Sequence, residues 1–147
     1  MDNKLKSKTR LAAIQLIAQH LINNQDIDLI KDDFDKNYRN TVLDENSIKI
    51  QYNVNFLSKL INYFKTIDFS GLSKEINNII KFNRTFEKWD TINQAIILTS
   101  LGELRNCDKT KINIILNDYI EISKSFVTLK ETKLINSILD KLIHENK

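Results

Sequence analysis

Residues 112–142 carry the pattern that most restricts how this chain can fold. Apolar side chains recur there at steps of three and four, in one run that reaches Phe126 and in another that begins at Leu134. An α-helix with this spacing gathers them on one face. Between the runs, Thr128 and Glu131 stand three apart, which is the spacing of a capping box. The stretch therefore predicts a helical hairpin whose two apolar faces need other helices to cover them.

The rest of the chain supplies candidates for those helices. Helical periodicity recurs at about residues 7–23, 25–36, 53–67, 70–80 and 90–104. Side chains that favour the first position of a helix stand at or near most of these starts, namely Ser7 or Thr9, Asn53 or Asn55, Ser70, and Asp90. The segment 90–104 is apolar on a broad face, as is typical of a helix at the centre of a bundle.

Two stretches lack helical periodicity. Residues 38–52 are polar and irregular, with Ile48 and Ile50 alternating, and predict a loop with a short extended piece. This loop is the natural boundary between an N-terminal subdomain at about 1–52 and a C-terminal subdomain at about 53–147, within a single domain 1–147. Residues 82–89 hold several aromatic side chains and predict a linking segment that packs against the core.

Composition favours the same all-α fold, with about seven helices in compact packing. The 147 residues include two Gly and no Pro, fewer turn formers than a sheet protein needs. Cys107 is the sole cysteine, so no internal disulfide can form and a reducing compartment such as the cytoplasm is expected. No apolar run approaches membrane-spanning length, and the first residues are polar rather than signal-like.

The sequence offers no catalytic constellation, so we predict that the protein is not an enzyme and needs no cofactor or metal. His20 and His144 stand apart, and the acidic segment 26–35 lacks the glycine and terminal glutamate of a calcium loop. That segment is instead typical of an amphipathic helix with a solvated acidic face. Glu103 is expected to be solvent-exposed or paired with a lysine.

The first ten residues concentrate positive charge. Lys4, Lys6, Lys8 and Arg10 oppose the single acid Asp2, whereas the whole chain carries a net charge of only +3. Cations at the start of a helix oppose its dipole, and a spacing of two spreads them around the helix. This poor placement for stability favours a role outside the fold, the binding of nucleic-acid phosphates. The alternative is a charged terminus that aids solubility, and the residues alone do not separate the two.

Several stretches together resemble the NusB family of bacterial transcription antitermination factors. KSKTRLAAIQLIAQHL at residues 6–21 resembles the family's basic opening and first helix, and INQAIILTSLGEL at 92–104 is similar to its apolar helix. The strongest matches are NDYIEISKSF at 117–126 and KLINSILDK at 133–141, whose separation also fits.

This resemblance implies an all-α fold of two small packed helical bundles. It also implies binding of single-stranded boxA RNA together with NusE, a small-subunit ribosomal protein, within the RNA polymerase antitermination complex. By resemblance, the RNA contacts fall on Lys6, Lys8 and Arg10, with Lys4 added by proximity. The start of the last helix adds three further candidates, Lys130, Lys133 and Asn136.

The chain departs from the family pattern at several positions. Lysine mostly replaces arginine in the opening, and Ser7 replaces a cation there, which keeps phosphate attraction but removes the bidentate fork of arginine. Gly102 stands where the family usually has Tyr, and Lys130 stands where an acidic residue is common.

Two alternatives to the RNA-binding factor remain open. One is a helical protein-interaction module without RNA binding, with the acidic segment 26–35 as its partner surface. The other is an isolated NusB-like domain related to ribosomal RNA methyltransferases, whose catalysis would need sequence that this chain does not contain. Either a monomer or a homodimer is compatible with the sequence.

Overall fold

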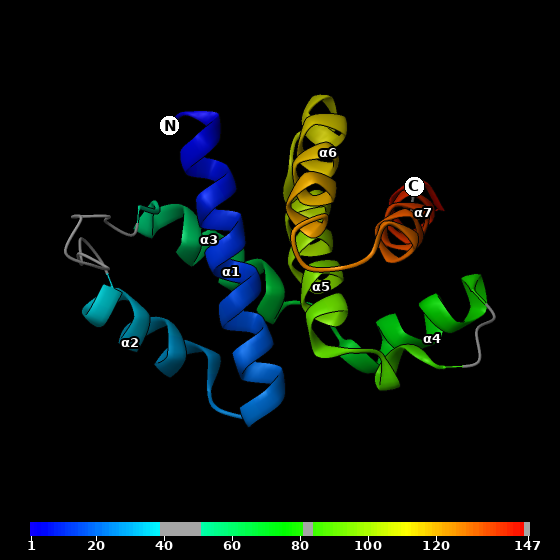
Figure 1. Ribbon diagram of the computed structural model, residues 1–147, viewed down its shortest axis with the longest axis horizontal. Helices are drawn as coiled ribbons and strands as arrows, with labels where there is room; N and C mark the ends of the chain where they lie inside the picture. Colours follow the sequence, from blue (N-terminus) through cyan, green and yellow to red (C-terminus); the bar gives the residue numbers. More distant parts are fainter. Residues whose placement is uncertain (39–50, 81–83, 146–147) are drawn as a thin grey trace.

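The computed structural model describes residues 1–38, 51–80 and 84–145 (Figure 1). Within these ranges the chain forms seven α-helices, two short 3-10 helices and no strand, which confirms the predicted all-α fold. The bounds are α1 Asn3–Asn23, α2 Ile27–Tyr38, α3 Val54–Lys65, α4 Phe69–Ile79, η1 Phe86–Lys88, α5 Thr91–Asn106, η2 Lys109–Lys111, α6 Ile112–Ser123 and α7 Leu129–Glu145. None of these helices is long and apolar enough to cross a membrane.

Helix α5 lies at the centre of the fold, as its broad apolar face predicts. Every residue from 93 to 104 is buried, and α5 packs against α1, α3, α6 and α7 (Figure 1). Two buried hydroxyls on this helix are satisfied locally, because Thr99 donates to the carbonyl of Ala95 and Ser100 to that of Ile96. These hydrogen bonds leave neither hydroxyl unpaired inside the core.

Helices α3 and α5 approach closely at Gly102. A Cβ atom added there would lie 3.2 Å from Tyr63 Cβ and 3.3 Å from the Tyr63 carbonyl carbon. The absence of a side chain at Gly102 is therefore what lets the two backbones come together. A large side chain such as tyrosine has no room between these two helices as they pack here.

The predicted hairpin is confirmed as α6 and α7, with the capping box in place. Thr128 Oγ1 accepts the Glu131 backbone N–H at 3.1 Å, and Glu131 Oε1 accepts the Thr128 N–H at 3.2 Å. The placement of Phe126 on the buried face is wrong, since 40% of its surface is exposed. Helix α6 ends at Ser123, so Phe126 lies in the turn rather than on the helix.

Two other helices begin earlier than their sequence signals predict. Asp2 caps α1, accepting the Leu5 N–H at 2.7 Å, so the helix starts before either predicted cap, Ser7 or Thr9. Helix α4 begins after Asp68 rather than after Ser70. In contrast, Asn53 caps α3 as predicted, accepting the Phe56 N–H at 2.8 Å.

The remaining expectations concern the two irregular segments. Most of the predicted loop, including Ile48 and Ile50, lies outside the described residues, as does Phe82. The described part of the linking segment does pack inward, because Phe86 is fully buried. The subdomain boundary at residue 52 stays a prediction; α3, just beyond it, packs against both α1 and α5.

Candidate nucleic-acid interface

The lysines of α1 lie on its solvent side. Lys4 and Lys8 are exposed and Lys6 is half-buried. Lys8 Nζ donates to Gln51 Oε1 at 3.2 Å, while Lys4 and Lys6 form no ion pair with any described residue. Three ammonium groups are therefore available at the surface near the start of this helix.

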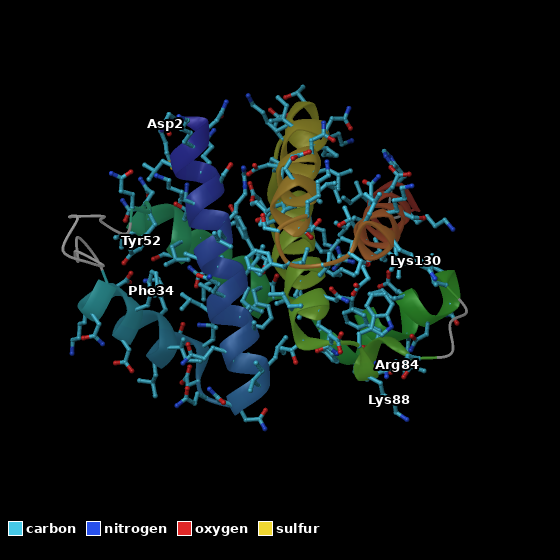
Figure 2. The ribbon with its side chains drawn as sticks, in the orientation of Figure 1. Asp2, Phe34, Tyr52, Arg84, Lys88 and Lys130 are labelled. Carbon is cyan, nitrogen blue, oxygen red and sulfur yellow. The ribbon has the colours of Figure 1, made fainter. Side chains whose placement is uncertain are left out.

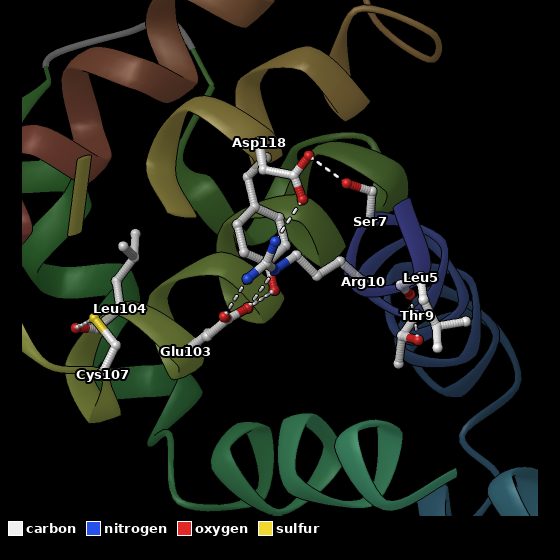
Figure 3. A network of polar contacts seen from close by, with 9 residues as sticks. Leu5, Ser7, Thr9, Arg10, Glu103, Leu104, Cys107 and Asp118 are labelled. Carbon is white, nitrogen blue, oxygen red and sulfur yellow. Dashed lines mark hydrogen bonds and ion pairs between the residues drawn. The ribbon is translucent and has the colours of Figure 1, made fainter. Parts of the chain in front are cut away.

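Arg10 does not lie with them at the surface, and the expectation that it is poorly placed for stability is wrong. Only 6% of its surface is exposed. Its Nε and Nη2 atoms donate to the two carboxylate oxygens of Glu103 at 2.8 and 2.7 Å, and Nη1 donates to Asp118 at 2.6 Å (Figure 3). The guanidinium thus ties α1 to α5 and α6 and faces the interior rather than solvent.

Other residues complete this buried network. Tyr119 Oη donates to Glu103 at 2.7 Å, and Ser7 Oγ donates to Asp118 at 2.6 Å. The Arg10 guanidinium also lies 5.6 Å from the centre of the Tyr119 ring. Glu103 is therefore neither exposed nor paired with lysine, contrary to expectation, and the hydroxyl of Ser7 serves the fold.

The network shifts the protonation equilibria of its members. Burial alone would lower the pKa of the Arg10 guanidinium, but its hydrogen bonds and charge interaction with Glu103, together with Asp118, raise it above its usual value. Burial, followed by the charge of Glu103, raises the pKa of Tyr119 well above its ordinary value. Both groups accordingly keep their protons in the folded protein.

The positions of the cations around the axis of α1 explain which of them face solvent. Lys4 and Lys8 are four residues apart and share one face, whereas Arg10 shares a face with Ile14 and Ile17, both fully buried. A sequence signal for the inward position of Arg10 therefore existed in its spacing from these isoleucines. The identity of its acidic partners, about a hundred residues away, had no such signal.

The second group of predicted residues forms a stripe on α7. Lys130, Lys133 and Asn136 follow one another at steps of three, and all three are exposed. The two lysines make no ion pair with described residues, so their charges are free to attract anions. Their backbone position is fixed by the capping box and by Asn93 of α5, whose Nδ2 donates to Glu131 Oε2 at 2.6 Å.

The two cationic groups are not brought together. Figure 2 shows Asp2, at the start of α1, and Lys130, at the start of α7, on opposite sides of the column formed by α5 and α6. An RNA strand that contacts both would have to cross this column.

Sequence reasoning missed two exposed cations, Arg84 and Lys88, that flank η1 beside Trp89. Neither forms an ion pair with a described residue. Figure 2 shows both on the same side of α5 as Lys130. The signal for them was the basic and aromatic composition of the linking segment.

Other candidate chemistry is accounted for by local contacts. No three His, Cys, Asp or Glu side chains in the described ranges are grouped to hold a metal ion. His20 packs edge-on against Phe64, with its Nδ1 against the carbonyl of Gln25, and His144 pairs with Asp140 at 3.1 Å. These positions match ordinary surface and boundary histidines.

Comparison with known proteins gives one consistent result. Residues 7–144 match the sequence profile of the NusB family. The chain is 32% identical to "Transcription antitermination protein NusB" of Rickettsia bellii, with 99% of this chain and 96% of the relative covered. The proteins of the same name from Rickettsia felis and Rickettsia massiliae are 30% and 29% identical over the same shares of each chain.

Proposed function

Since the chain belongs to the NusB family, we propose that it is a transcription antitermination factor that binds boxA-type single-stranded RNA together with NusE. In this role it suppresses premature termination and supports ribosomal RNA synthesis within the RNA polymerase antitermination complex. The observation that carries the RNA contact is the set of lysines at the starts of α1 and α7 that have no acidic partner among the described residues; all but the half-buried Lys6 are exposed.

Each lysine group has a defined task in this proposal. Lys4, Lys6 and Lys8 attract backbone phosphates at one end of the RNA, and Lys130 and Lys133 do so at the other. Asn136, exposed next to them, offers both a hydrogen-bond donor and an acceptor to a base or a sugar. Arg10 contacts no RNA; it is a positioning residue that holds the start of α1 against α5 and α6.

Fluorescence anisotropy with labelled boxA RNA, with and without NusE, tests the proposal. Replacing Lys4, Lys6 and Lys8 by Gln should weaken binding and lower the slope of log K against log salt by about 0.7 for each phosphate that is no longer neutralised. Lys36→Gln removes a charge from an exposed site on α2 and should change neither quantity. Binding that does not distinguish boxA from a scrambled RNA, or that survives the triple substitution unchanged, would refute this proposal.

One observation favours the protein-interaction module as a second function. On α2, Leu29 is 63% exposed and lies beside the exposed carboxylates of Asp32 and Asp33. Such a surface suits a basic protein partner with an apolar anchor. Capture of NusE that persists after nuclease treatment, with no RNA affinity by anisotropy, would favour this module over the RNA-binding factor.

A further inference from the structure

Trp89, the sole tryptophan of the chain, is held in a fixed orientation at the molecular surface. It follows η1 directly and is partly exposed. Its indole N–H donates to the carbonyl of Arg84 at 3.2 Å. Its ring packs against that of Phe86, with 5.2 Å between ring centres and 67° between planes. Because Phe86 is fully buried, the indole is anchored on its inner side and open on its outer side.

Two exposed cations flank this indole. Arg84 and Lys88 are both exposed, and neither has an ion-pair partner in the described ranges. The intervening acid, Glu87, is engaged elsewhere, since Oε1 accepts a hydrogen bond from Asn77 of α4 at 3.3 Å. Two positive charges therefore flank the ring without an ion pair in the described ranges, although Glu87 and the exposed Asp90 keep negative charges close to them.

This surface lies at the same end of the molecule as the lysines of α7. The hydrogen bond from Asn93 to Glu131 joins the first turn of α5, which follows Trp89, to the first turn of α7, which carries Lys130. Figure 2 shows Arg84, Lys88 and Lys130 on one side of the central helices. The indole and its two flanking cations thus lie on the same side of the central helices as Lys130.

We propose that Trp89 is a stacking platform for a nucleobase of single-stranded RNA, with Arg84 and Lys88 contacting the phosphates on either side of that base. The inference rests on the proposed RNA-binding function and adds a residue to it. Proteins that bind single strands combine phosphate-attracting cations with aromatic rings on which bases stack. The lysine groups of α1 and α7 include no aromatic residue, and Trp89 supplies one beside the second group.

The sole tryptophan makes the test direct, because all indole fluorescence of the protein reports on Trp89. The full chain is titrated with single-stranded boxA RNA, while anisotropy follows binding of the same RNA. Stacking predicts quenching that saturates with the anisotropy change. Inorganic polyphosphate, which carries charge without bases, should compete for the protein without quenching to the same extent.

Anisotropy and indole fluorescence together distinguish failure of the stacking proposal from failure of the proposed function. Anisotropy that reports RNA binding while indole fluorescence stays constant overturns the platform and leaves the proposed function standing. Anisotropy that reports no RNA binding, with or without NusE, overturns both.

Variants add a second measure of the stack. Trp89→Leu, which keeps an apolar contact with Phe86, should weaken RNA binding by about 5- to 100-fold, and Trp89→Phe should restore most of the loss. Circular dichroism and urea unfolding establish that each variant is folded. Arg84→Gln and Lys88→Gln should each lower the salt slope by about 0.7, unlike Lys36→Gln. A folded Trp89→Leu variant with wild-type affinity would contradict the proposal.

Discussion

Replacing Arg10 by Met tests whether this residue serves the fold rather than RNA. Methionine keeps an apolar stem of similar length but removes the guanidinium and its bonds to Glu103 and Asp118. The Glu103 carboxylate, with 6% of its side chain exposed, would then be left buried without a cation. We therefore expect a large loss of stability and no direct loss of a phosphate contact.

The magnitude follows from what each partner keeps. Removing one member of a buried ion pair costs about 3–5 kcal/mol. Glu103 retains the Tyr119 hydroxyl, and the side chain of Asp118 is 21% exposed and retains Ser7, so the lower end applies. A loss of about 3 kcal/mol is a large part of the roughly 5–15 kcal/mol that stabilises a typical domain. It should move the urea midpoint down by roughly 1–2 M.

Urea unfolding followed by circular dichroism measures this change. Lys8→Met, on the exposed face of the same helix, is the matched control and should shift the free energy of unfolding by less than about 0.5 kcal/mol. The double variant Arg10→Met with Glu103→Met removes both charges and should be less destabilised than the sum of the two single variants.

Two results would refute the reasoning. One is an Arg10→Met protein that unfolds within about 0.5 kcal/mol of the wild type. The other is a reduced salt slope for RNA binding by folded Arg10→Met, since only Lys8→Met should show that reduction, of about 0.7.

Three further predictions concern other parts of the fold. Burial and Glu103 raise the pKa of Tyr119, so the folded state keeps a proton that the unfolded chain releases, and stability should fall as the pH rises above about 10. Between about pH 8 and about pH 11, urea unfolding should show a smaller loss of unfolding free energy for Tyr119→Phe than for the wild type. Thr128→Ala removes the capping box of α7 and should cost about 1 kcal/mol in thermal or urea unfolding, with no loss contradicting its role. Gly102→Ala gains about 1 kcal/mol of helix propensity but crowds Tyr63, so we expect a net loss of about 1 kcal/mol; a clear gain would show that α3 yields easily.

The parts of the fold that sequence predicted are those governed by local rules. The capping box of Thr128 and Glu131 and the cap at Asn53 depend on residues three positions apart, and both predictions are confirmed. The central position of α5 followed from its broad apolar face. The start of α4 was wrongly predicted at Ser70, because the exact end of a helix depends on more than the nearest capping residue.

The residues of the candidate site also fall into those that local sequence rules predicted and those that depend on tertiary packing. The lysines of α1 and α7 could be placed on the surface because charge at exposed helical positions needs no partner. The buried position of Arg10 was not predicted, because its environment depends on Glu103 and Asp118, which only the tertiary fold brings near. Trp89 was expected to pack inward with its segment, and its partial exposure depends on how Phe86 fills the core beneath it.

The buried network around Arg10 also constrains the order of events during synthesis. Arg10 is made early, whereas Glu103 follows 93 residues later. At synthesis rates of about 5–20 residues per second, the guanidinium waits roughly 5–20 s for its first carboxylate. Until then α1 lacks α5, the helix that covers much of its apolar face. The nascent chain can therefore pack its first helix against α2 and α3 but completes the contacts of that helix only when its second half emerges.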